Sequence, residues 1–276
     1  MRRKPRAGDV INGYGALKYV VIKDGEFDVA ARLKIPANPA IKTIDFPCTV
    51  TDDHGNRYNV VKIDDSAFKG CPQLTSVCIF SQSIRDIGQS AFEGCPKLTY
   101  VRIDSPLERI QSKSFRNCSS LSTVELHCPL RFIENNAFER CINLSRIKLP
   151  DSVEEISDAA FLDNYSLVEV RLPESLLRIG CRAFYNDSSL RAISFPGGLS
   201  SIGSGAFGRC GNLKEVDLKE TGITAIEHAT FMGCTKLTTL ILPKGLQSIG
   251  FSAVQGCDNL SLVSIPGFNE VIHIPQ

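Results

Sequence analysis

The chain has 276 residues, with 31 Lys and Arg against 30 Asp and Glu, so its formal net charge at pH 7 is +1. This balance gives no overall attraction to nucleic acid or to an anionic membrane. No apolar run reaches the roughly 18 residues that a membrane span needs, and the basic start MRRKPR is not followed by the apolar core of a secretory leader. We therefore expect no membrane span. The location stays weakly determined, because removal of a leader would leave no trace here.

The first 59 residues are predicted to form a strand-rich cap. The stretches 17–36 (LKYVVIKDGEFDVAARLKIP) and 49–63 (TVTDDHGNRYNVVKI) contain β-branched and alternating apolar residues around turn formers. Asp24-Gly25 marks the turn of the first stretch, and His54-Gly55-Asn56 marks the turn of the second. Both stretches are therefore predicted to be β-hairpins.

Residues 60–265 repeat with a period of about 23 residues. The unit reads L-x-x-I-x-x-x-A-F-x-x-C-x-x-L-x-x-V-x-L-P. An Ile lies five residues before the Phe position and a Leu six residues after it in all nine units. Val254 takes the Phe position in the last unit, and the other units have Phe68, Phe92, Phe115, Phe138, Phe161, Phe184, Phe207 and Phe231.

Each unit is predicted to be one coil of a solenoid. The segment L-x-x-V-x-L has the period-two pattern of a short strand, and a following Pro, as at Pro150 and Pro173, ends that strand because it has no N–H. Turn formers between the Ile and the Phe predict a tight bend into a single helical or 3₁₀ turn. A single coil cannot bury its apolar edge, so we expect nine coils to stack, with one parallel strand from each.

These columns resemble the leucine-rich repeats of the BspA-like type, over residues 60–265. The resemblance implies a leucine-rich-repeat solenoid of the α/β horseshoe type, mostly β with short helical or 3₁₀ turns. The preceding residues 1–59 resemble that family's N-terminal cap, which would cover the apolar edge of the first coil. Residues 266–276 are too short for a tenth unit and are predicted to be a tail or a cap strand.

Seven of the eleven cysteines share one repeat column, in which Asn164 and Asp187 occupy the two remaining units. Because this position accepts Cys, Asn and Asp, we interpret the column as a ladder of buried side chains that form hydrogen bonds with the backbone amides of the turns. Cys would serve there as a small core residue and a weak hydrogen-bond donor. Disulfide bonds within the column are not excluded, since neighbouring coils lie about 5 Å apart. A zinc site fits poorly, because zinc needs ligands that converge from several directions and a column presents them in parallel. Outside the column lie Cys48, Cys78, Cys128 and Cys181, of which Cys78 is predicted to be the most exposed.

No catalytic motif is recognisable. The four histidines have no metal-binding or catalytic spacing, and GSGAFG at residues 203–208 lacks the Lys of a phosphate-binding loop. We expect a non-catalytic protein without a cofactor or a metal.

The outward positions of the predicted strands are the candidate partner-binding face. Their side chains vary from unit to unit while the core columns do not, as a recognition surface requires. Mixed charges and a single aromatic residue, Tyr100, favour a protein or peptide partner over nucleic acid. The alternative is an ordinary soluble sheet surface. The candidate residues are Ser76, Cys78, Tyr100, Arg102, Thr123, Glu125, Arg146, Lys148, Glu169, Arg171, Glu215 and Asp217.

The sequence thus predicts a protein–protein interaction module. The resemblance implies a cell-surface or secreted, adhesin-like protein that binds a host-surface or extracellular-matrix protein. The alternative is an intracellular scaffold or structural spacer with no role in adhesion. The absence of a leader or anchor and the many cysteines support that alternative, and a cytoplasmic location stays open.

Overall fold

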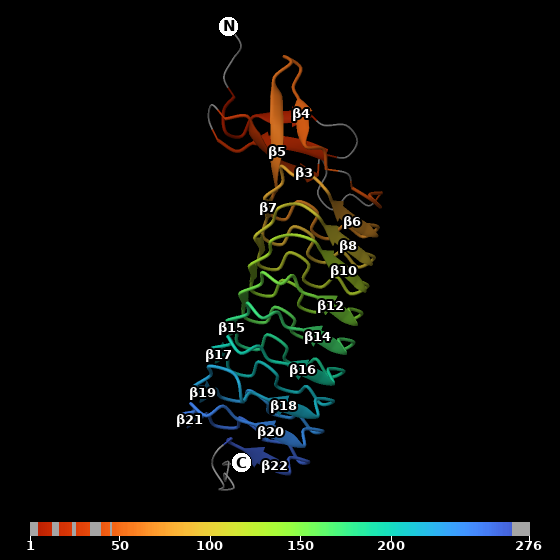
Figure 1. Ribbon diagram of the computed structural model, residues 1–276. Coiled ribbons are helices and arrows are strands. Elements are labelled where there is room, and N and C mark those ends of the chain that lie inside the picture. Colours follow the sequence, from red (N-terminus) through yellow and green to blue (C-terminus); the bar gives the residue numbers. More distant parts are fainter. Residues whose placement is uncertain (1–4, 13–16, 24–25, 34–39, 45, 267–276) are drawn as a thin grey trace.

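A row of stacked coils runs from a small β cap to the C-terminal end of the computed structural model (Figure 1). The structure describes residues 5–12, 17–23, 26–33, 40–44 and 46–266. Residues 267–276 and the predicted turn at Asp24-Gly25 lie outside these ranges. No helix within them could cross a membrane.

The cap is a mixed sheet with the strand order β1-β2-β3-β5-β4. β2 pairs antiparallel with both β1 and β3, β4 pairs antiparallel with β5, and β3 pairs parallel with β5. The antiparallel β2–β3 and β4–β5 pairs are the two predicted hairpins. The bounds are β1 Val10–Asn12, β2 Leu17–Val21, β3 Asp28–Leu33, β4 Thr49–Thr51 and β5 Arg57–Ile63.

β5 connects the cap to the coils. It also pairs parallel with β7, in the second coil, and Phe46 packs edge-on against Phe68 with the ring centroids 5.7 Å apart. The first coil is therefore covered on its N-terminal side. The predicted division between residues 59 and 60 lies inside β5 and stays a prediction.

Nine parallel strands, here called the main row, follow one another along one side of the solenoid (Figure 1). They form three sheets, β6-β8-β10, β12-β14-β16 and β18-β20-β22, and β10 neighbours β12 as β16 neighbours β18. The strands are β6 Ser76–Ile79, β8 Tyr100–Ile103, β10 Thr123–Leu126, β12 Arg146–Lys148, β14 Glu169–Arg171, β16 Ala192–Ser194, β18 Glu215–Asp217, β20 Thr239–Ile241 and β22 Leu262–Ser264.

A second row of two-residue strands lies along the other edge of the coils, and sequence reasoning did not foresee it (Figure 1). Each strand of this row ends on the repeated Ile, which is buried in all of them except Ile249. The strands are β7 Asp86–Ile87, β9 Arg109–Ile110, β11 Phe132–Ile133, β13 Glu155–Ile156, β15 Arg178–Ile179, β17 Ser201–Ile202, β19 Ala225–Ile226 and β21 Ser248–Ile249.

The core is a continuous stack of the eight repeated phenylalanines. All eight side chains are fully buried. Successive rings lie nearly parallel, with centroids between 5.2 Å and 5.9 Å apart along the stack from Phe68 to Phe231. Offset parallel rings at this separation attract one another beyond their area burial. The repeat therefore fixes both the core and the spacing of the coils.

The bends around each Phe are hydrogen-bonded turns rather than the expected helical or 3₁₀ turns, within the described part of the chain. The residues two before and two after each Phe have positive φ, such as Ser66 at 54° and Gly70 at 70° around Phe68. Their N–H groups and that of the Phe donate to the next coil, while the N–H groups of the residues beside the Phe, such as Ala67 and Lys69, donate to the carbonyl three residues back. Left-handed residues at both sides of the Phe prevent a right-handed helix from propagating.

The cysteine column lies in the core, as interpreted, and its thiols donate to carbonyl oxygens. All seven cysteines are buried and free. Six of them, such as Cys95 toward Phe68 at 3.2 Å, donate to the Phe carbonyl of the preceding coil. Asn164 makes the same contact with Phe138 through Nδ2. The thiols thus act as donors, whereas the Asp187 carboxylate in the same column accepts the backbone N–H of Asn164.

The expectation for Cys78 was wrong. Cys78 faces outward but is half-buried, whereas Cys48 and Cys181 are exposed and Cys128 is buried. The long Arg102 side chain lies beside Cys78 on the neighbouring strand, which limits the exposure of a short side chain.

Candidate binding face

All twelve candidate residues point outward from the main row. They form two columns, which together we call the strand face. The outer column takes the first residue of each strand and the inner column the third, so that Tyr100 aligns with Thr123 and Arg102 with Glu125. The residue between them is buried in every strand from β6 to β20. Alternation across a strand therefore separates the face from the core.

The charged side chains in the N-terminal part of the face pair with neighbouring side chains of the protein itself. Arg102 donates from Nε and Nη2 to the Asp104 carboxylate at 3.1 Å and 2.9 Å, and it lies 3.9 Å from Glu125. Tyr100 donates to Glu125 at 2.9 Å. The Arg102 guanidinium, and secondarily His127 at 2.9 Å, lowers the pKa of Asp104. We call this group the paired cluster.

Three residues of this region were missed by the sequence analysis: Phe80, Asp104 and His127. The Phe80 side chain is 54% exposed, and the Arg102 guanidinium lies 5.4 Å from its ring centroid. All three follow a strand at the position where the repeat usually has Pro. The absence of Pro at these three positions was the sequence signal that could have identified them.

The centre of the face is different, because its cations have no ionic partner among the residues that the structure describes. Arg146, Lys148 and Arg171 are exposed, and none of them forms an ion pair or a side-chain hydrogen bond with any residue that the structure describes. Lys148 lies directly opposite Arg171 in the register of β12 and β14. Like charges on neighbouring strands repel each other, so a bound carboxylate would relieve an existing repulsion.

A hollow of about 530 Å³ lies over β14 and β16. Its lining includes Arg171 from the first strand and the small residues Ala192 and Ser194 from the second. Glu169, Glu174 and Arg191 also line it. The outward side chains of β16, Ala192 and Ser194, are small and leave room for this depression.

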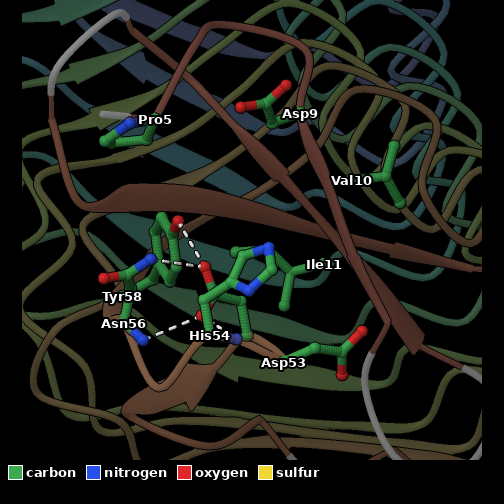
Figure 2. A pocket seen from close by; sticks show the side chains of 9 residues that line it. Pro5, Asp9, Val10, Ile11, Asp53, His54, Asn56 and Tyr58 are labelled. Atoms are coloured by element: carbon green, nitrogen blue, oxygen red, sulfur yellow. Dashed lines mark hydrogen bonds between the residues drawn. The ribbon is translucent and has the colours of Figure 1, made fainter. Parts of the chain in front are cut away.

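A second cleft, of about 230 Å³, lies in the cap (Figure 2). Asp52 contributes to it, but its carboxylate accepts from the backbone N–H of His54 and of Asn56, from Asn56 Nδ2 and from the Tyr58 hydroxyl. These bonds hold the β4–β5 turn and lower the pKa of Asp52 against the opposing effect of burial. The carboxylate therefore organises the turn and has little capacity left for a ligand.

No group of three or more His, Cys, Asp or Glu side chains is arranged to hold a metal ion within the described ranges. Several buried thiols have a strongly raised pKa. Contact with Cys118, together with burial, raises the pKa of Cys95 to about 12, and burial raises the pKa of Cys128 to about 11. Such thiols remain protonated at neutral pH and are poor nucleophiles.

The model of the BspA type leucine rich repeat region matches the sequence over residues 48–168 and 154–275, which together span most of the chain. The chain belongs to this family. Its repeat columns and its stacked coils are thus those of a BspA-type leucine-rich-repeat protein. A search of curated protein sequences finds no match.

Solved structures give similar folds. The pneumococcal vaccine antigen PcpA is 20% identical, with 95% of this chain and 82% of that chain covered, at a TM-score of 0.52. A leucine rich cell surface protein from Faecalibacterium prausnitzii is 21% identical, with 95% and 96% covered, at a TM-score of 0.46. A leucine-rich-repeat protein from T. pallidum is 25% identical, with 91% and 90% covered, at 0.45. At this identity the likeness to PcpA shows the fold alone.

Proposed function

We propose that this BspA-type chain is a non-catalytic protein-binding module of a cell-surface or secreted protein, and that its strand face engages the partner. The observation that carries the proposal is the set of exposed, unpartnered cations Arg146, Lys148 and Arg171 on a rigid sheet. A rigid frame orders no loop on binding, so the entropic cost of association is small. The partner class follows the family and is a host-surface or extracellular-matrix protein.

The test measures binding of the purified chain to a panel of purified matrix proteins. Arg146→Ala, Lys148→Ala and Arg171→Ala together should weaken binding about tenfold or more, because each removes an interfacial charge. The midpoint of urea unfolding should stay close to that of the wild type, since exposed side chains without partners contribute little to stability.

The matched control removes three cations from the region of the second row: Arg85→Ala, Arg109→Ala and Arg178→Ala. It changes the net charge equally but leaves the strand face intact. Binding of this control should equal that of the wild type. If the control loses as much affinity as the face variant, the attraction depends on net charge alone and the proposed face is wrong.

An intracellular scaffold is the second candidate, and the eleven free cysteines favour it, because thiols persist in reducing compartments. Surface labelling of intact producing cells with a membrane-impermeant reagent separates the two. Labelled protein supports the cell-surface proposal, and protein that is labelled only after lysis supports the scaffold.

A further inference from the structure

The inner column of the strand face changes the sign of its charge over four successive strands. Lys148 on β12 and Arg171 on β14 are cationic, Ser194 on β16 is neutral, and Asp217 on β18 is acidic. Glu215 adds a second carboxylate to β18. A cationic region and an acidic region therefore lie on either side of the strand with the smallest side chains.

The hollow lies between these two regions. It covers β14 and β16, and Ala192 and Ser194 form part of its lining. A side chain that crosses the face from the cations to the carboxylates passes over this depression. An aliphatic side chain would fill space that polar rim residues leave open.

The spacing of the charges matches an extended polypeptide. β12 and β18 are three strands apart, which is about 14 Å at the usual separation of roughly 4.8 Å. The coils are evenly spaced here, since the Phe rings from Phe138 to Phe207 are separated by 5.4, 5.2 and 5.3 Å. In an extended chain the side chains at i, i+2 and i+4 share one face, and i to i+4 spans about 13 Å.

We infer that the strand face binds an extended segment of the partner protein with an acidic residue at i, an aliphatic residue at i+2 and a basic residue at i+4. The inference rests on the proposed function and specifies its ligand. The acidic side chain contacts Lys148 and Arg171, the aliphatic one enters the hollow, and the basic one contacts Glu215 and Asp217. The segment crosses the strands along the axis of the solenoid.

Two neighbouring charges are compatible with this placement. Glu169 lines the hollow from the outer column, where it lies opposite Arg146 rather than between Lys148 and Arg171. Asp217 lies 3.1 Å from Lys219, but both side chains are nearly half exposed. An exposed pair of this kind contributes little, so a basic residue of the ligand can replace Lys219 at small cost.

The test uses three fluorescently labelled heptapeptides and fluorescence polarisation at low ionic strength. The probe is Gly-Glu-Ser-Leu-Ser-Lys-Gly, and the comparison peptides carry Glu or Lys at both charged positions. The mixed-charge probe should bind about tenfold more tightly than either comparison peptide, because only the probe matches both charged regions. Equal binding of the three peptides, or no binding of the probe, overturns the inference.

A charge-reversal variant gives a specific readout. Lys148→Glu with Arg171→Glu should change the preference to the peptide with two lysines. Arg85→Glu with Arg178→Glu, which changes the net charge equally in the region of the second row, should retain the preference for the mixed-charge probe. A control that loses this preference contradicts the assignment of the face.

The face is also self-complementary in charge, so a second copy of the chain is the rival occupant. Sedimentation velocity decides between them: the wild type should be monomeric, and a dimer that the Lys148→Glu/Arg171→Glu variant abolishes overturns the peptide proposal.

Failure of the peptide proposal can be distinguished from failure of the proposed function. If the alanine variant loses matrix-protein binding while the three peptides bind equally, the proposed function stands and only the ligand pattern fails.

Discussion

At the scale of single residues, Asp187 is the least expected member of the core. It occupies the cysteine column, is fully buried, and accepts the backbone N–H of Asn164 at Oδ1 with a distance of 2.8 Å. Its Oδ2 has no partner in the structure. Burial raises the pKa of Asp187 well above its ordinary value, because the charged form would lie in a low-dielectric core. Burial therefore favours the protonated form of this carboxyl group in the folded protein.

This environment predicts a pH dependence. The folded pKa lies above the unfolded value of 3.8, so the stabilisation by the proton is complete below that value and is lost as the pH rises toward the folded pKa. Relative to Asp187→Asn, the wild type should lose up to about 1.4 kcal/mol of unfolding free energy per pH unit in this window. Urea unfolding of both proteins from pH 4 upward measures the difference. Parallel stability profiles would show that Asp187 is charged in the core.

At the scale of the element, a Pro shortly after a main-row strand accompanies a strand of three residues, although β18 also has three residues and no such Pro. β12, β14, β16, β20 and β22 are followed within two residues by Pro and have three residues. β6, β8 and β10 lack this Pro and have four. Asp104 and His127, at the Pro position, donate N–H to Ile79 and Ile103 at 2.9 Å and 2.8 Å. Pro cannot donate this bond.

His127→Pro should therefore destabilise the protein without changing the fold. It removes the backbone bond to Ile103, which is worth about 1 kcal/mol, and the contact of the ring with Asp104. His127→Ala is the control, because it removes the ring and keeps the N–H. Chemical denaturation should place His127→Pro about 1 kcal/mol below His127→Ala. Equal stabilities of the two variants would mean that the backbone hydrogen bond from residue 127 to Ile103 contributes nothing to the free energy of unfolding.

At the scale of the whole molecule, the stacking can be predicted from the sequence because all core positions recur with the same spacing along the chain. The Phe, Ile and Leu positions identify the coil, its buried side and the outward columns, including Arg146 and Lys148. The parallel pairing of β3 with β5 was not predictable, because it joins segments on either side of a long connection. The Arg102 contact with Phe80 and the hollow over Ala192 were not predictable either. They depend on how neighbouring side chains pack on the face, and the residue types in the aligned repeats do not specify this packing.

The central claim is that the strand face, rather than the cap or the second row, contacts the partner. The most direct measurement modifies lysine and arginine side chains with and without the matrix protein that binds best, and reads their reactivity by mass spectrometry. Lys148 and Arg171 should lose reactivity in the complex, while Arg85 and Arg178 should react as they do in the free protein. Protection confined to Arg85 and Arg178, with Lys148 and Arg171 unchanged, would contradict the claim.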